Sequence, residues 1–366
     1  MKKLCLLVVC LMFAGCTSEK QETGSEPAAK APEVAVTPDD PAVVEALTAL
    51  GAKTKTDGDG LIIEVNLRDT DANDETLKTI AKLKNVKSLL LNDLEIGDAG
   101  LEAIKNVSWP ISNLDLRGCP VSNTGLSHLT GLSSLKALRL SGSNSSASVD
   151  DDGMASVAQL PNLKVLSLDK LWVSEVGIEQ LLPLKNLSEL YLAETTIGDD
   201  ALAMFSKLPA LRKLRLARNQ ISNDGLKHLA RLTDLVELDL SEISLLSDDG
   251  LQHLSSLTNL SKLNLWRVPV GDAGVQYLKP LTNLEWLNLD NTRLSDDGLP
   301  ALVEMKKLTF LHLGSTLVSD AGLTHLTGLT ALKDLKVTRT AVTEDGVTEL
   351  QKSLTTTEIQ LEYLAN

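Results

Sequence analysis

The sequence predicts an α/β solenoid in which a short strand and a short helix alternate about twelve times. Three observations predict it. An apolar pattern recurs roughly every 24 residues, a helix-start signal follows each recurrence, and the 43% of hydrophobic residues are almost all aliphatic, since aromatic residues make up only 3%. The 366 residues exceed the size at which single cores stop growing, about 250–300 residues. A repeat array escapes that limit because each unit packs only on its neighbours.

Each repeat begins with an L-x-x-L-x-L pattern typical of a strand. Its first apolar residue falls at Ile62, Val86, Ile111, Leu135, Leu163, Leu187, Leu211, Leu235, Leu260, Leu284, Leu308 and Leu332. The spacing is 24 or 25 residues, except for 28 after Leu135, and a final strand-like segment starts at Thr356. Each unit continues into a segment such as S-D-D-G-L, in which a capping residue precedes an apolar i, i+3 pattern typical of a short helix.

This pattern resembles the leucine-rich repeat superfamily over residues 62–366. The S-D-x-G-L-x-x-L form is similar to a bacterial type related to the repeats of ribonuclease inhibitor and of F-box receptor proteins. The resemblance implies a right-handed β-α superhelix, or horseshoe, of about twelve repeats plus a final strand. Most repeats carry Thr or an aliphatic residue at the ninth position, and Cys119 occupies it once, where we expect a small buried filler.

The N-terminus predicts a secretory signal over residues 1–15. Two lysines precede an apolar run from Leu4 to Ala14, which is too short to span a bilayer. The segment F-A-G-C resembles the lipobox of bacterial lipoproteins, which implies lipidation of Cys16 and a membrane anchor. In the Gram-negative sorting rule, an Asp after the lipidated cysteine retains a lipoprotein at the inner membrane. By this resemblance, Thr17 at that position implies the outer membrane or cell surface instead. The alternative is an ordinary signal peptide that releases a soluble protein.

Two further segments precede the repeats. Residues 16–40 are polar and rich in Pro, Ala and Glu, which predicts a disordered tether after the lipidated cysteine. Residues 41–61 predict an N-terminal cap, with Val44, Leu47 and Leu50 at helical spacing and a hairpin with a glycine turn beyond them. The repeat domain then covers residues 62–366.

The concave side of the predicted sheet should carry rows of alternating charge. Repeat positions 1, 4 and 6 point inward, so positions 3 and 5 face the hollow, with positions 2, 7 and 8 at its rims. Position 3 carries Glu189, Lys213, Glu237 and Lys262, and position 8 carries Lys170, Glu194, Arg218, Glu242 and Arg267. Parallel strands place like positions side by side, so we expect cross-strand ion pairs rather than a basic docking patch. The net charge of −14 argues against a nucleic-acid partner.

Aromatic and amide side chains gather further along the same face, and they are the candidate ligand-binding residues. Three successive repeats carry the aromatic residues Trp266, Trp286 and Phe310. Beside them, position 5 carries Asn264, Asn288 and His312. A further aromatic residue, Tyr191, is more distant. Exposed aromatic residues flanked by amides recur at protein-binding hot spots and also stack on sugars. A third possibility is that Trp286 and Phe310 only pack on each other as a cross-strand pair.

The sequence shows no pattern for catalysis. Four of the five histidines share one repeat position, and neither metal-ligand spacing nor a phosphate-binding loop occurs. Asp151 and Asp152, in the long loop 141–153, fit capping carboxylates better than calcium ligands. We therefore expect a non-enzymatic, membrane-anchored lipoprotein without cofactor or metal, which binds a protein through its concave sheet. The alternative is a glycan or cell-wall binding module.

Overall fold

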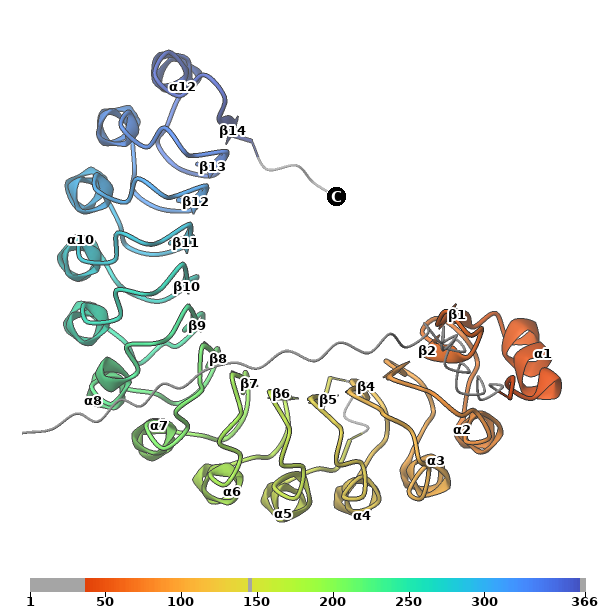
Figure 1. Cartoon of the computed structure of the whole chain (residues 1–366). Helices are drawn as coiled ribbons and strands as arrows, with labels where there is room; N and C mark the ends of the chain where they lie inside the picture. Colours follow the sequence, from red (N-terminus) through yellow and green to blue (C-terminus); the bar gives the residue numbers. More distant parts are fainter. Residues whose placement is uncertain (1–36, 144–146, 363–366) are drawn as a thin grey trace, which may run out of the picture. The chain divides into compact units, whose positions relative to one another are not determined.

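The computed structural model describes residues 37–143 and 147–362. The predicted signal peptide, Cys16 and nearly all of the predicted tether lie outside these residues. The chain divides into Met1–Thr37 and a compact unit, Pro38–Asn366. Within the second unit, strands line the inner side of a curved array and helices line its outer side (Figure 1). The predicted repeat solenoid is therefore confirmed.

The described residues form one 14-stranded sheet whose order follows the sequence. Its strands are β1 Lys53–Thr56, β2 Ile62–Asn66, β3 Ser88–Leu90, β4 Asn113–Asp115, β5 Ala137–Ser141, β6 Val165–Asp169, β7 Glu189–Tyr191, β8 Lys213–Arg215, β9 Glu237–Asp239, β10 Lys262–Asn264, β11 Trp286–Asn288, β12 Phe310–His312, β13 Asp334–Lys336 and β14 Glu358–Gln360. Only β1 is antiparallel, as the first strand of a hairpin with β2. From β2 onward each strand pairs in parallel with the next, as shown by Trp286 facing Phe310.

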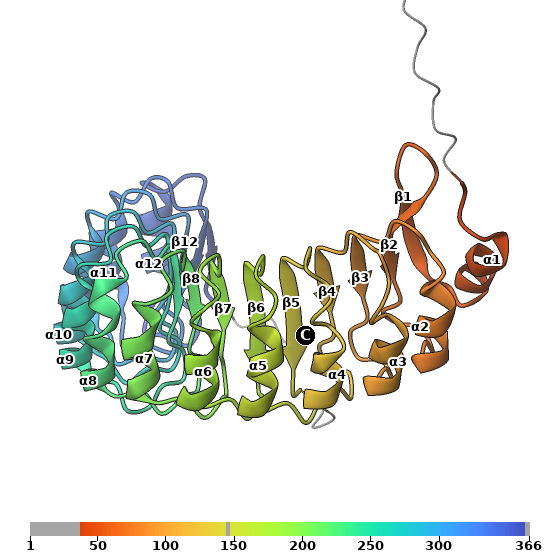
Figure 2. The ribbon, with the colours of Figure 1, turned by 60° about the horizontal axis from the view of Figure 1, so that its bottom comes forward.

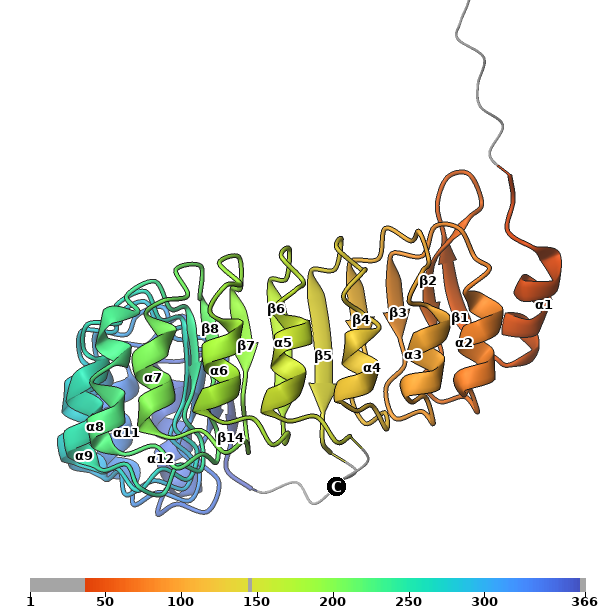
Figure 3. The same cartoon turned by 90° about the horizontal axis from the view of Figure 1, so that it is seen from below.

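Short helices return the chain from one strand to the next. The α-helices are α1 Pro41–Ala49, α2 Asp74–Ile80, α3 Asp98–Ala103, α4 Asn123–Ser127, α5 Met154–Val157, α6 Glu175–Leu181, α7 Asp199–Phe205, α8 Asn223–Leu226, α9 Asp248–Leu251, α10 Asp272–Val275, α11 Asp320–Leu323 and α12 Glu344–Gln351. The 3₁₀ helices are η1 Asp151–Gly153, η2 Leu229–Arg231, η3 Gln252–Leu254, η4 Gln276–Leu278, η5 Asp296–Leu302 and η6 Thr324–Leu326. Helices α2 to α7 lie side by side along one face of the sheet (Figure 3).

Stacked leucines fill the space between strands and helices. In the repeat that contains β11, Leu284, Leu287 and Leu289 occupy positions 1, 4 and 6 and are all fully buried. Burying one such side chain stabilises the fold by about 1.5–3 kcal/mol. Buried residues of this kind form a single cluster from Val43 to Leu354. Each repeat therefore depends on its neighbours for its core, as expected for a solenoid.

The S-D-x-G-L motif is explained by contacts between successive repeats. Asp296 accepts hydrogen bonds from the backbone N–H of Ser319 at 2.8 Å and from its hydroxyl at 2.5 Å. Ser319 in turn caps α11 through the N–H of Ala321. A Cβ atom on Gly322 would lie 2.2 Å from the same Asp296 carboxylate, so the motif needs glycine there. The Asp, Ser and Gly of the motif thus belong to one contact that ties each helix to the next.

Thr316 and Cys119 both occupy the ninth repeat position, and each donates a hydrogen bond to a backbone carbonyl. Thr316 donates a buried hydrogen bond to the carbonyl of Leu313 at 2.6 Å. Cys119 is fully buried and donates to the carbonyl of Leu91, and burial raises the pKa of its thiol to about 11, which confirms the filler role.

In α1 the buried residues are Val43 and Leu47, whereas Val44 is 40% exposed. The expected helical face was therefore wrong by one residue, because the buried pair has i, i+4 rather than i, i+3 spacing.

The N-terminal end of the unit is covered by α1 and the hairpin (Figure 2). The buried carboxylate of Asp39 accepts a hydrogen bond from the N–H of Ile62 at 2.7 Å, which ties this segment to β2.

The extra residues of the 28-residue repeat accompany a longer strand pair. Strands β5 and β6 are in register over five positions, from Ala137 to Ser141, whereas most neighbouring strands pair over three.

Candidate binding surface on the concave sheet

The first charged row, at repeat position 3, forms the expected ion pairs only in part. The ammonium group of Lys213 lies 3.0 Å from Glu237 and 3.5 Å from Glu189. The hydrogen bond with Glu237 raises the pKa of Lys213. Lys262 was expected to continue this row, and that expectation was wrong. Its ammonium lies 4.7 Å from the ring centre of Trp286 and makes no ion pair within the described part of the chain.

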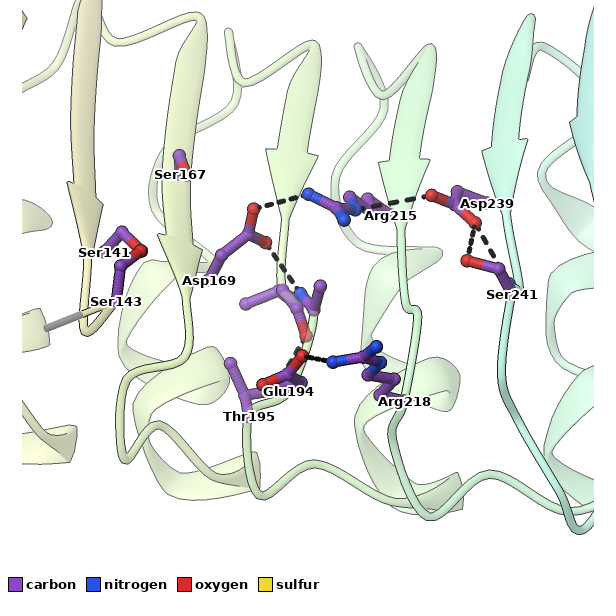
Figure 4. Close-up of polar contacts among 12 residues, drawn as sticks. Ser141, Ser143, Ser167, Asp169, Glu194, Thr195, Arg215, Arg218, Asp239 and Ser241 are labelled. Carbon is purple, nitrogen blue, oxygen red and sulfur yellow. Dashed lines mark hydrogen bonds and ion pairs between the residues drawn. The ribbon is translucent and has the colours of Figure 1, made fainter. Parts of the chain in front are cut away.

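A second set of charges crosses the strands at Arg215 (Figure 4). Its guanidinium reaches over β7 to Asp169 at 2.9 Å and also lies 3.3 Å from Asp239. Ser241 donates to Asp239 through its backbone N–H and its hydroxyl, at 3.0 and 2.7 Å. Burial raises the pKa of Asp169, against the opposing effect of Arg215. Arg215, on β8, therefore neutralises two carboxylates, one on β6 and one on β9.

The row at position 8 is confirmed around Arg218. Arg218 bonds to Glu194 on one side (Figure 4) and to Glu242, at 2.5 Å, on the other. These hydrogen bonds raise the pKa of Arg218 and lower that of Glu242. Arg267 lies 3.9 Å from Glu242, whereas Lys170 makes no ion pair with a described residue. Strands β6 to β9 thus carry a largely self-neutralised surface.

The next strands carry a stack of aromatic rings instead. The rings of Trp286 and Phe310 are parallel within 5°, with their centres 4.9 Å apart. Lys262 covers Trp286, and the ammonium of Lys336 lies 5.6 Å from the ring centre of Phe310. Strands β10 and β12 flank β11, so Lys262 and Phe310 lie on opposite sides of Trp286. Both faces of this indole are therefore in contact with neighbours, and its edge faces the hollow.

The polar residues beside the stack have hydrogen-bonding groups to spare. The amide oxygens of Asn264 and Asn288 accept the backbone N–H groups of Trp266 and Asp290, at 3.2 and 2.9 Å. Their NH₂ groups have no partner within residues 37–143 and 147–362. The ring of His312 packs edge-on against Phe310 at 6.3 Å, and burial lowers its pKa. This part of the sheet therefore presents donors and a neutral imidazole at pH 7.

A hollow of about 190 Å³ joins the two parts of the sheet. It extends from Tyr191 to Trp286 and is also lined by Lys213, Arg215, Glu237, Asp239, Lys262 and Asn264. The Tyr191 hydroxyl donates to Glu189 at 2.8 Å, and burial raises the pKa of Tyr191. Tyr191, expected to be distant, thus shares one hollow with Trp286. We refer to it below as the Tyr191–Trp286 hollow.

A larger hollow lies elsewhere, at the N-terminal end. It has a volume of about 670 Å³ and is lined by α1 and its surroundings, including Pro38, Pro41 and Val44. It contains neither an aromatic side chain nor an ion pair. We place the candidate site in the smaller hollow because charged, amide and aromatic side chains converge there.

The structure separates Trp266 from the stack and shows an aromatic residue that the sequence analysis missed. Trp266 packs under Arg267 at 5.6 Å and contacts neither Trp286 nor Phe310 through its ring. Trp172 is 72% exposed and forms an isolated β-bridge with Asp150, between β6 and α6. Leu317 occupies the same repeat position and is 69% exposed. The sequence contained a signal for these two exposed residues, because most other repeats carry a polar residue or proline at the position where Trp172 and Leu317 stand.

No group of three or more His, Cys, Asp or Glu side chains is placed to hold a metal ion in the described segments. Among the same residues, no helix has the length and apolar character needed to cross a membrane.

Comparison with known proteins supports the fold. The family described as "Leucine Rich repeat" matches residues 207–230. The crystal structure of an internalin, inlF, from Listeria monocytogenes is similar with a TM-score of 0.61 and 18% identity, over 89% of this chain and 95% of that chain. A TDR receptor structure is similar with a TM-score of 0.53 and 17% identity, over 80% of this chain and 50% of that chain.

A further internalin structure, inlC2 of Listeria monocytogenes, is 23% identical over 58% of this chain and 84% of that chain, with a TM-score of 0.45. No curated protein matches the sequence. The repeat match and the similarity to the inlF structure, together with the parallel sheet, define the fold as a leucine-rich repeat solenoid. At these identities the similarity establishes the fold alone.

Proposed function

We propose that the protein is a non-enzymatic scaffold that binds another protein through its concave sheet. The observation that carries this proposal is the Tyr191–Trp286 hollow, where aromatic edges lie beside donors that have no partner in the described chain. Aromatic residues with polar neighbours are typical of protein-binding hot spots. Nearly all charges of β6 to β9 are paired, so they offer complementarity at a rim rather than a single charged patch.

The glycan alternative is not favoured by the geometry of the aromatic rings. Sugars stack on an open ring face. Trp286 has Phe310 at 4.9 Å on one side and Lys262 at 4.7 Å on the other. Phe310 likewise has Lys336 at 5.6 Å. A protein side chain that contacts the ring edges needs no such opening.

The proposal includes a membrane anchor at the cell envelope. The lipobox-like segment that ends at Cys16 supports it, and an acylated cysteine with several chains attaches a protein stably to a bilayer. We propose the outer membrane or cell surface, with residues 16–40 as tether and residues 41–61 as cap. Expression of the full chain with Cys16→Ala tests the anchor: the variant should leave the membrane fraction, and unchanged fractionation would refute lipidation.

Capture of partners from envelope extract tests the binding surface. The tagged full chain is compared with a Trp266→Ala, Trp286→Ala, Phe310→Ala variant. A matched control carries Trp172→Ala and Tyr277→Ala, which remove aromatic residues that are 72% and 39% exposed. We expect a protein captured by the parent and the control to be lost in the triple variant. Equal capture by all three chains would refute the role of the aromatic residues.

A further inference from the structure

We propose that the Tyr191–Trp286 hollow receives the side-chain carboxylate of an aspartate or glutamate from the protein partner, with Lys262 and Asn264 as its hydrogen-bond donors. This inference rests on the proposed function and names the chemistry that the partner must present. The carboxylate would enter between two aromatic residues, at the point where the paired charges of β6 to β9 end.

The donors at this point are fixed in orientation. The backbone N–H of Trp266 requires an acceptor, and the amide oxygen of Asn264 supplies it at 3.2 Å. The NH₂ group of Asn264 is thereby turned to the other side, and it has no partner within the described residues. Lys262 is held by Trp286 rather than by a carboxylate. An amide NH₂ and an ammonium on one strand thus lack an acceptor.

The acidic groups that line the hollow are already engaged. Glu237 pairs with Lys213 at 3.0 Å, and Asp239 accepts from Ser241 and lies 3.3 Å from Arg215. Arg215 uses Nη1 to contact Asp169 and Nε to contact Asp239, and its Nη2 makes no hydrogen bond within the described chain. The groups left over are therefore donors, and their complement is an acceptor with negative charge.

The size of the hollow favours a single side chain over a free small molecule. Its volume is about 190 Å³, whereas small-molecule sites usually measure roughly 300–1,000 Å³. Trp286 lines the hollow, with Phe310 stacked on its other side, and it suits an apolar residue next to the acidic one. The expected recognition element is an Asp or Glu beside an apolar side chain in a protein segment.

One substitution reverses the chemistry while it preserves the local fold. Asn264→Asp keeps the oxygen that accepts the N–H of Trp266 and replaces the donor NH₂ with a charged oxygen. Asn66→Asp is the matched control, because Asn66 also accepts an N–H two residues on, from Arg68, at the far end of the sheet. Both variants add the same charge to equivalent repeat positions. Only the first adds it to the hollow.

Selection from a phage-displayed library of random peptides tests the inference on the full chain. Peptides selected by the parent should be enriched in Asp and Glu next to apolar residues. Their affinity should fall about tenfold or more for Asn264→Asp and stay unchanged for Asn66→Asp. A Lys262→Glu, Asn264→Asp double variant should select peptides enriched in Lys and Arg instead.

Peptides without acidic enrichment, or acidic peptides that bind Asn264→Asp as tightly as the parent, would overturn the inference. A library that yields no binder at all would also overturn it. The proposed function fails independently, when the aromatic triple variant captures the same proteins as the parent. If that variant loses capture but the selected peptides show no enrichment in Asp or Glu, the proposed protein-binding function stands and the carboxylate site is refuted.

Discussion

Strands β6 to β9 and strands β10 to β13 share one backbone geometry but present different chemistry. In the first stretch Arg215 and Arg218 each bridge two carboxylates, so attraction across strands is satisfied internally. In the second stretch rings stack, and Asn264, Asn288 and Lys262 keep N–H groups without a hydrogen-bond acceptor in the described residues. A satisfied surface gains little from a partner, whereas unpaired donors gain hydrogen bonds on binding. The comparison points to the second stretch as the place for recognition.

The largest effect should come from breaking the paired region at Arg215, which bridges two carboxylates. Arg215→Met leaves the Asp169 carboxylate, which is only 17% exposed, without its cation. We expect a loss of about 2 kcal/mol, below the range for fully buried pairs because Arg215 is 44% exposed. Urea unfolding measures this change, and amide exchange should localise it to β6 to β9.

The control for Arg215 is its neighbour Arg212. Arg212 pairs with Asp234 at 3.0 Å, but these side chains are 44% and 63% exposed. Arg212→Met should change the free energy of unfolding by less than about 0.5 kcal/mol. Equal losses in both variants would mean that the Asp169 carboxylate has no special dependence on Arg215.

The next effect concerns the aromatic region. Trp286→Ala removes the stack with Phe310 and the cover that Lys262 provides. We expect a loss of about 1 kcal/mol in the free energy of unfolding, because cross-strand and aromatic pairs contribute about 0.2–1.5 kcal/mol. Trp172→Ala, at a site that is 72% exposed, should be nearly neutral in the same urea titration. A neutral Trp286→Ala would show that the stack does not stabilise the sheet.

The smallest effect should be a pH dependence in the second stretch. Burial lowers the pKa of His312 below the ordinary histidine value of 6.5, with Asp290, Asp334 and Lys336 as charged neighbours. The unfolded chain therefore binds a proton at a higher pH than the folded chain. The contribution of His312 is fully present above pH 6.5 and is lost as pH falls towards the folded pKa.

His312→Gln should remove this dependence. Between pH 7.5 and about 5 the parent should lose more stability than the variant, because protonation of His312 favours the unfolded chain. Urea titrations at the two pH values measure the difference. Identical pH profiles for the two chains would show that His312 titrates alike in both states.

The repeat pattern predicted most of the fold but not the details of the site. Leucine spacing fixed which residues are buried, because the inward positions of a strand recur with period two. The position of Val44 was missed because one helical turn offers two nearly equivalent apolar spacings. The Lys262 prediction failed because a lysine between Glu237 and Trp286 can turn towards either neighbour, and sequence alternation carries no rule for that choice.

By itself the sequence determined the solenoid, the order of its strands and the neighbours of each concave residue, since a fixed repeat length aligns like positions. Only the tertiary structure decided which of those neighbours pair. It joined Tyr191 to Trp286 across three intervening strands and carried Arg215 over β7 to Asp169. The physical reason is that the path of the backbone follows from local pattern and burial, whereas the partner of a long polar side chain depends on rotamers and distances across several strands.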